Sequence, residues 1–329
     1  MPQKELMLFD LDQNWRHGHR IATHLEIPVS PHEERRFEDG EMKVRPLVGV
    51  RDRDVFVVQS LLGDAHDSVH DKLWRLLLFI GALRDSSARR ITVVAPYLAY
   101  GRKDRRTKPR DPVVTRQLAI LFEAAGTDRV VTIDVHNLAA FENAFRCRTE
   151  NLLARPLFAD HVRSTMEGGA IVVVSPDVGG MKRVEQLYET LACSLPHPIG
   201  LAFMEKTRNA GIVGGGQLVG DVDGCRVLIL DDLIATGTTM LRAAEACRKA
   251  GAVSVTALAT HGVFAPGAVE MLQSPAFDSV VVTDTVPPWR LEDGESIRKL
   301  TILDTSPLFA EAIARLHAGG SLSDLLHSN

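Results

Sequence analysis

Two adjacent carboxylates, Asp231 and Asp232, follow a short apolar run and precede a loop of small and hydroxyl-bearing residues. The run, residues 227–230, is typical of a strand buried on both faces. The pattern of residues 241–250, closed by Gly251, predicts a helix. The loop that joins them consists of Ala235, Thr236, Gly237, Thr238 and Thr239.

Such a loop, at the N-terminus of a helix, offers free backbone N–H groups and the positive end of the helix dipole, and both suit a phosphate group. Two carboxylates beside it can accept hydrogen bonds from the vicinal hydroxyls of a sugar. The stretch therefore predicts a ribose-phosphate pocket. The alternative is an ordinary strand and a capped helix, because Asp and Thr are common N-cap residues.

A second junction of strand, loop and helix has the sequence Ser-Pro-Asp-Val-Gly-Gly and follows a predicted strand at residues 171–174. The N–H groups of Gly179 and Gly180 can bind a pyrophosphate, and the carboxylate of Asp177 can hold Mg²⁺. Gly-Gly alone is a weak signal, whereas the whole string after a buried strand is stronger.

Two clusters of cations follow other predicted strands. Lys206 and Arg208 come after residues 199–204; at positions i and i+2 of an extended segment they share one side, where both can stabilise a phosphoryl group in transfer. Arg102 and Lys103, with further cations around Asp104, come after residues 91–95, where α/β folds place ligands, and they suit a polyphosphate. The alternatives are an exposed strand end and a solvated basic loop.

Predicted strands and helices alternate along the chain, which indicates an α/β fold with mostly parallel sheets. The boundary between two similar halves is expected in the polar stretch 148–156. The strands are predicted at residues 6–11, 55–59, 91–95, 130–133, 171–174, 199–204, 219–222, 227–230, 253–260 and 279–283. The helices are predicted at residues 16–25, 67–84, 113–125, 157–166, 181–191, 241–250 and 307–317.

The chain has 329 residues, enough for two domains, and its composition, 45% hydrophobic and 24% charged, is that of a globular protein. A formal net charge of −4 gives no reason to expect a nucleic-acid partner. Four scattered cysteines favour a reducing, cytoplasmic setting. Residues 1–12 do not resemble a signal peptide, and no apolar run is long enough for a membrane span.

The order of these motifs, from about Arg36 to the C-terminus, resembles the ribose-phosphate pyrophosphokinase (PRPP synthetase) family. The resemblance implies transfer of the β,γ-pyrophosphoryl group of ATP to the anomeric hydroxyl of ribose 5-phosphate, which gives PRPP and AMP. It implies two type I phosphoribosyltransferase-like domains. Residues 1–152 would form the ATP-side domain and residues 153–306 the ribose 5-phosphate and PRPP domain, with the segment 307–329 packing back on the first.

The resemblance also implies roles for individual residues. Lys206 and Arg208 would be catalytic, and Asp177, Gly179 and Gly180 would form the pyrophosphate loop. Asp231, Asp232 and the loop 235–239 would bind ribose 5-phosphate, and His136 and Asp177 would contact the cofactor Mg²⁺. The residues expected to bind ATP are Phe37, Asp39, Glu41, Arg102, Lys103, Asp104 and His136.

The sequence departs from the family pattern at Lys103, where the family usually has Gln, which bears on nucleotide preference. Residues 107–111 are expected to be a lid over ATP, and residues 209–216 a flexible flap. The family also implies a dimer-based homo-oligomer. Two other functions stay open: a phosphoribosyltransferase that uses PRPP, and a non-catalytic, synthetase-associated regulatory subunit. The complete set of site residues favours an active enzyme.

Overall fold

The computed structural model describes residues 5–12, 15–166, 168–205, 208–209, 212–213, 216–291 and 298–326. It forms two compact units. Unit 1 comprises the chain up to Leu153 and the segment that begins at Thr305, and unit 2 is Ala154–Asp304. The predicted fold class, α/β with mostly parallel sheets flanked by helices, is confirmed in both units.

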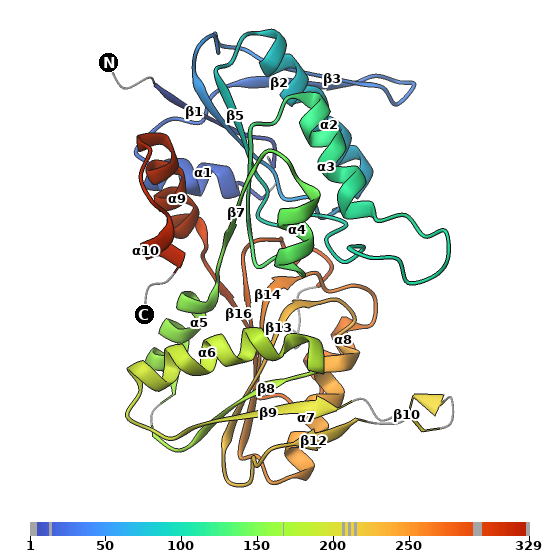
Figure 1. Ribbon diagram of the computed structural model, residues 1–329, viewed down its shortest axis with the longest axis vertical. Coiled ribbons are helices and arrows are strands. Elements are labelled where there is room, and N and C mark those ends of the chain that lie inside the picture. The colour runs from blue at the N-terminus through green and yellow to red at the C-terminus, as the bar shows by residue number, and fades with distance from the viewer. Residues whose placement is uncertain are drawn as a thin grey trace. The chain divides into compact units, whose positions relative to one another are not determined.

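Unit 1 is built on a parallel sheet whose strands lie in the order β1-β4-β5-β6-β7 (Figure 1). The inner strands β4, β5 and β6 bury side chains on both faces; Val55 of β4, for example, pairs with Met7 on one side and Ile91 on the other. Such double-sided burial is what covered parallel strands require. Their bounds are β1 Leu6–Asp10, β4 Asp54–Val58, β5 Arg90–Val94, β6 Arg129–Ile133 and β7 Arg148–Leu152.

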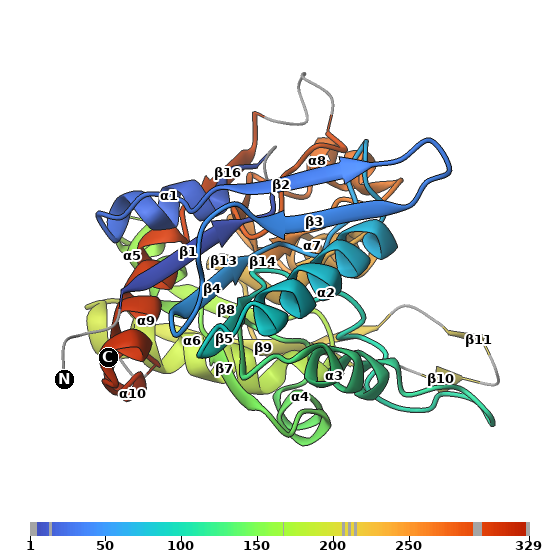
Figure 2. The same cartoon turned by 90° about the horizontal axis from the view of Figure 1, so that it is seen from above.

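Helices cover both faces of this sheet. Figures 1 and 2 show α2 (Val69–Asp85) and α3 (Val114–Ala125) on one face, and α1 (His17–His24) and α9 (Ser306–Ala318) on the other. The helix α9 returns from the end of the chain, and the Nδ1 of its His317 lies 2.7 Å from the buried Asp54 carboxylate. Shorter helices complete the unit: α4 Leu138–Ala144 and α10 Ser323–Leu326.

An antiparallel hairpin, β2 (His32–Arg36) and β3 (Met42–Pro46), lies beside α2 (Figure 2). The sequence did not predict it, because His-Glu-Glu-Arg-Arg lacks the apolar alternation of a half-buried strand. The strand β7 was also missed, since it begins inside the polar stretch expected to separate the domains.

Unit 2 is built on a larger sheet with strand order β12-β9-β8-β13-β14-β15-β16, in which only β12 is antiparallel to its described neighbour. The strands are β8 Ile171–Ser175, β9 Ile199–Glu205, β12 Gln217–Val219, β13 Arg226–Ile234, β14 Ser254–Gly262, β15 Ser279–Thr283 and β16 Leu300–Leu303. The helices are α5 Arg155–Thr165, α6 Met181–Ser194, α7 Thr238–Lys249 and α8 Ala268–Gln273.

Two strand predictions in unit 2 were wrong at their ends. The central strand β13 does not stop at Leu230: it continues through both aspartates, because pairing with β14 persists to Ile234 and Gly262. The edge strand β12 ends at Val219, where a strand at residues 219–222 was predicted, and Gly220 follows at φ +120°. Among the described residues, no helix is both long and apolar enough to cross a membrane.

Candidate active site

The acid pair lies within the central strand of unit 2. Asp231 and Asp232 belong to β13, where successive side chains point to opposite faces, yet an arginine of α6 reaches both. The Nη1 of Arg183 lies 3.2 Å from Asp231 Oδ1, and its Nη2 lies 3.6 Å from Asp232 Oδ1. Asp232 is almost completely buried, whereas the Asp231 side chain is 25% exposed. Asp231 is thus the member of the pair with more access to a ligand.

Burial raises the pKa of Asp231, and the neighbouring charge of Asp232 raises it further, to about 7. The Arg183 guanidinium acts in the opposite direction, and so does the backbone N–H of Asp232, which donates to Asp231 Oδ1 at 2.9 Å. A ligand hydroxyl that donates a hydrogen bond to Asp231 would stabilise the charged form of this carboxyl group.

The loop after β13 leaves the start of α7 open. Gly237 is the N-cap at φ +77°, and no side chain caps the helix there. A Cβ at Gly237 would also lie 2.7 Å from Met271 of α8, so only glycine fits without a shift. Thr236, Thr238 and Thr239 are exposed, and the Oγ1 atoms of the first two lie 3.0 Å apart. Exposed hydroxyls around an uncapped helix N-terminus match the predicted phosphate cradle.

The loop after β8 lies at the same edge of the sheet, because β8 and β13 are parallel neighbours with Val174 paired to Ile229. Asp177 Oδ1 accepts a hydrogen bond from the Gly180 backbone N–H at 3.2 Å, and a short 3₁₀ turn leads into α6. A Cβ at Gly180 would lie 2.6 Å from Ser175 Oγ, so the turn needs glycine there. The structure therefore brings Asp177, Gly179 and Gly180 to the strand end beside the acid pair.

The predicted catalytic cations follow β9, the other neighbour of β8. Lys206 lies outside the described residues. Arg208 is the first residue of β10 (Arg208–Asn209), which pairs with β11 (Ile212–Val213). The rest of the predicted flap, apart from Gly216, also lies outside the described residues.

On the ATP side, two predicted segments of unit 1 meet. Asp104 Oδ2 accepts a hydrogen bond from Asn137 Nδ2 at 2.6 Å, which ties the basic loop to the segment after β6 that carries His136. Arg102, Lys103 and His136 are exposed around this contact. The Asp111 carboxylate accepts hydrogen bonds from Thr107 and Lys108. The predicted lid, residues 107–111, therefore forms a turn held by hydrogen bonds within the segment.

The remaining ATP-side residues, Phe37, Asp39 and Glu41, form the turn of the β2–β3 hairpin. The Phe37 N–H donates to Glu41 O at 2.8 Å, and the Glu41 N–H donates to Asp39 Oδ1 at 3.0 Å. The Arg35 guanidinium lies 4.6 Å from the centre of the Phe37 ring, over one face. The other face is the one on which a purine can stack without displacing Arg35.

Two residues of these sites were missed by the sequence analysis. Arg183 stands one helical turn after Gly180 and meets carboxylates 48 positions away, and Asn137 stands next to His136 and meets a residue 33 positions away. A cation in the first turn of a helix after a phosphate-binding loop was the available signal for Arg183.

Among the described residues, no group of three or more His, Cys, Asp or Glu side chains is arranged to hold a metal ion. A partly exposed carboxylate such as Asp177 nevertheless suits Mg²⁺, which keeps several waters and takes other ligands from phosphates. The exposed imidazole of His136 suits Mg²⁺ less well as a direct ligand, since this ion prefers oxygen.

Comparison with known families and structures gives consistent matches. Residues 6–126 match the N-terminal domain of ribose phosphate pyrophosphokinase, and residues 214–327 match the phosphoribosyl synthetase-associated domain. The chain is 38% identical over 321 residues to ribose-phosphate pyrophosphokinase of Caldanaerobacter subterraneus subsp. tengcongensis, covering 97% of both chains. It is 39% identical over 306 residues to that of Hyphomonas neptunium, covering 93% of this chain and 94% of the relative. The crystal structure of phosphoribosylpyrophosphate synthetase from Mycobacterium smegmatis matches with a TM-score of 0.85 and 32% identity, covering 96% of this chain and 100% of the other.

Proposed function

The chain belongs to the ribose-phosphate pyrophosphokinase family, and we propose that it transfers the β,γ-pyrophosphoryl group of ATP to the anomeric hydroxyl of ribose 5-phosphate. The products are PRPP and AMP. The observation that carries the proposal is the acid pair of β13, which stands between two glycine-containing loops suited to phosphate groups.

In this proposal, Asp231 and Asp232 accept hydrogen bonds from the ribose hydroxyls. The loop from Ala235 to Thr239 binds the 5-phosphate with backbone N–H groups and threonine hydroxyls. Arg183 compensates the charge of the acid pair while the sugar is absent, since its two Nη atoms lie near one oxygen of each carboxylate.

The pyrophosphoryl group would be bound by the N–H group of Gly179 and, once the ligand displaces its contact with Asp177, by that of Gly180, with Lys206 and Arg208 balancing the charge in the transition state. Asp177 and His136 are the residues proposed to hold Mg²⁺, His136 through a water or a phosphate. When bound, the ion would neutralise phosphate charge. The protein's own part is to orient the anomeric hydroxyl and the pyrophosphoryl group for in-line attack.

On the ATP side, Arg102 and Lys103 would contact the nucleotide, with Asp104 held in place by Asn137. Phe37 would stack on the adenine ring, and the carboxylates of Asp39 and Glu41 would accept hydrogen bonds from the exocyclic amine or the ribose. These residues favour the synthetase over a phosphoribosyltransferase, which uses PRPP and needs no ATP site.

The direct test is to incubate the protein with ATP, Mg²⁺ and ribose 5-phosphate and to separate the products by chromatography. Formation of AMP and PRPP in equal amounts is expected. Turnover of PRPP with a nucleobase instead would indicate the transferase. A protein that is inactive alone but changes the rate of another synthetase would indicate the regulatory subunit.

The cation at Lys103 leads to a prediction about the nucleotide. Because Lys103 is exposed in the basic loop, replacing it with a neutral amide should reduce the attraction for ATP phosphates or sharpen base selectivity. Lys103→Gln should therefore change the ratio of rates with ATP and GTP, or the KM for ATP, by about 2–5-fold, the scale of one exposed charge. Steady-state kinetics with both nucleotides measure this, and Lys249→Gln, an exposed cation in the last turn of α7, is the control. Unchanged values would leave Lys103 as a solvated side chain.

We also propose a cytoplasmic, dimer-based homo-oligomer, on the strength of the family resemblance. Light scattering on the eluting peak of a sizing column measures the mass, and a monomer over the whole range of concentrations would contradict it.

A further inference from the structure

The β2–β3 hairpin carries the Phe37–Glu41 turn. Its sequence contains few apolar residues that could pack the hairpin against the rest of the unit. A two-stranded ribbon is at best marginally stable alone. Val44 is buried against α2, but β2 presents only His32, Glu34 and Arg36 on the corresponding face. Between hairpin and helix lies a cavity of about 320 Å³ with mostly charged walls. Apolar contact with α2 comes from Val44 and from the ring of His32, whose centre lies 5.7 Å from that of Phe79, so it does not fix the hairpin along its whole length.

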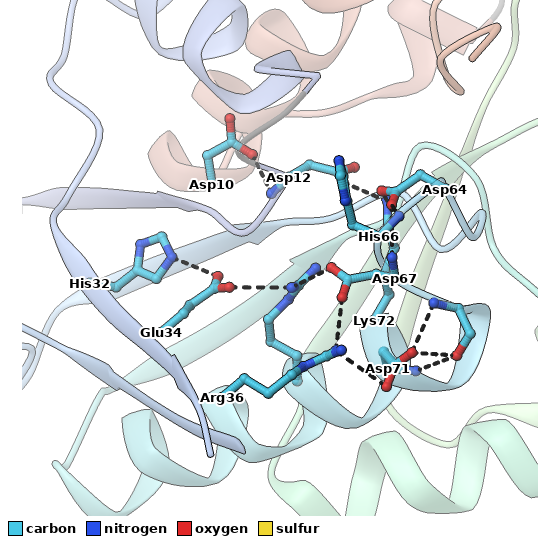
Figure 3. Close-up of polar contacts among 12 residues, drawn as sticks. Asp10, Asp12, His32, Glu34, Arg36, Asp64, His66, Asp67, Asp71 and Lys72 are labelled. Atoms are coloured by element: carbon cyan, nitrogen blue, oxygen red, sulfur yellow. Dashed lines mark hydrogen bonds and ion pairs between the residues drawn. The ribbon is translucent and has the colours of Figure 1, made fainter. Parts of the chain in front are cut away.

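Ion pairs bridge this space instead (Figure 3). Asp67 stands at the centre: its Oδ1 accepts from Arg36 Nη2 at 3.0 Å, and its Oδ2 accepts from Arg75 Nη1 at 2.8 Å. The same Arg75 Nη1 lies 3.2 Å from Glu34 Oε2. We call these four residues, Glu34, Arg36, Asp67 and Arg75, the ion-pair ladder. It joins two residues of β2 to α2 and to the loop before it.

The ladder extends at both ends. Glu34 Oε1 lies 2.9 Å from His32 Nε2, and Arg36 Nη2 lies 3.4 Å from Asp71 Oδ1 in the first turn of α2. Arg75 is 11% exposed and Asp67 17% exposed, so solvent screens the contact between them much less than that of a surface pair. Arg36 is 48% exposed, so its contact with Asp67 is screened more.

The loop that carries Asp67 is itself anchored to the sheet. Asp64 Oδ1 accepts the backbone N–H groups of His66 and Asp67, at 2.8 and 2.9 Å. Its Oδ2 lies 3.0 Å from Lys72 Nζ, which also donates to Asp12, two residues after the end of β1, at 2.9 Å. Lys72 is only 1% exposed. The position of Asp67 is therefore set by a buried contact with the carboxyl end of the sheet.

We propose that Asp67 and Arg75 are positioning residues for ATP: without touching it, they set the place of the Phe37–Glu41 turn through Glu34 and Arg36. The proposal rests on the proposed function, in which that turn meets the adenine base. Its basis is the continuous chain of contacts from the sheet through Lys72, Asp64 and Asp67 to Arg36, the residue that immediately precedes Phe37.

The test compares Asp67→Asn and Arg75→Gln with wild type in the full-length protein. The KM for ATP should rise about 5–20-fold, as expected when a charged, partly buried hydrogen bond is lost. The kcat and the KM for ribose 5-phosphate should stay within about 2-fold, because neither substitution touches the reacting groups. Hydrogen exchange of the backbone amides of β2 and β3 should accelerate about 10-fold, since local opening becomes easier.

The matched control is Glu33→Gln. Glu33 lies on the same strand but pairs across the hairpin with the exposed Arg45, away from the ladder, so exposed-pair energetics predict little change. An equal effect in Glu33→Gln would overturn the proposal, because any charge loss on the hairpin would then suffice. Unchanged exchange in both ladder variants would overturn it as well, and so would faster exchange with an unchanged KM for ATP.

A failure of the proposed function gives a different result. If the wild-type protein makes no PRPP, the synthetase assignment is wrong. Hydrogen exchange of the β2 and β3 amides still decides whether the ion-pair ladder holds the hairpin in place. Asp67→Asn keeps the size of the side chain, so it retains a folded protein for this measurement if Arg75→Gln does not fold.

Discussion

Alanine in place of Lys206 or Arg208 should lower kcat by about 10²–10³, the scale of losing one preorganised stabiliser of transition-state charge. The reaction moves a highly charged group between oxygens, so we expect the two cations to act mainly on that group in the transition state. The proposed sites for the ribose, the 5-phosphate and the adenine use other residues, so both KM values should change much less. The end of β9 is consistent with this role: the strand ends at Glu205 and is paired with β8, the strand that leads into the proposed pyrophosphate loop.

Replacement of Arg208 by Lys should restore little activity, because an ammonium group cannot reproduce a planar fork that donates to two phosphate oxygens. Steady-state kinetics with circular dichroism as a check of folding measure these effects. Lys249→Ala, an exposed cation in the last turn of α7, is the control for general loss of positive charge. Wild-type turnover in both folded variants would remove the catalytic assignment.

The parts of the candidate site whose secondary structure the sequence predicted are those encoded within one continuous stretch. A buried strand, a glycine-containing loop and an amphipathic helix follow one another within about 20 residues around Asp177 and around Asp231, and each junction has its own pattern. The structure places both junctions on neighbouring parallel strands, β8 and β13. Their proximity follows from the rule that parallel strands end at one edge of the sheet.

The parts that could not be predicted depend on contacts between distant positions. The sequence around Arg183 predicts only a helix residue, because its contacts with Asp231 and Asp232 depend on the position of β13. The strand β2 has no apolar alternation, and its Arg36 and Glu34 form ion pairs with Asp67 and Arg75. The extension of β13 beyond Leu230 also depends on its partner, since β14 supplies the backbone groups that keep Asp231–Ile234 extended.

Neutralising Asp231 should weaken ribose 5-phosphate binding and, at the same time, stabilise the unliganded protein. A lost hydrogen bond from a ribose hydroxyl to a partly buried carboxylate costs roughly 1–3 kcal/mol, or about 5–150-fold in affinity. Asp231→Asn and Asp232→Ala should both show this loss for ribose 5-phosphate and much less for ATP. Equal losses for the two ligands would contradict a sugar-binding role.

The stability effect follows from the pKa of Asp231, which burial and the charge of Asp232 raise from 3.8 to about 7. A group with a raised pKa binds its proton more tightly in the folded state, so between these values the folded protein holds more protons than the unfolded chain. Stability must then fall as pH rises through that window. Asp231→Asn removes this dependence, so its Tm should exceed that of wild type by about 2–4 °C near pH 8 for each kcal/mol relieved, with little difference below about pH 4.

The same titration should appear in binding. As pH falls through about 7, Asp231 gains a proton and loses an acceptor for the sugar, so wild-type affinity for ribose 5-phosphate should fall. The phosphate of the sugar titrates nearby, with a pKa of about 6. It does so equally with wild type and with Asp231→Asn, so the difference between their pH slopes isolates the carboxyl group.

Calorimetric titrations of both proteins from about pH 6 to 8.5 span this pKa and measure the slopes. Arg183→Gln should move the midpoint to higher pH, because Arg183 is the cation that opposes the rise in the pKa of Asp231. Asp160→Asn, an exposed carboxylate on α5, is the control and should change neither stability nor binding. Identical slopes in wild type and Asp231→Asn would show that the charge of Asp231 does not take part in holding the sugar.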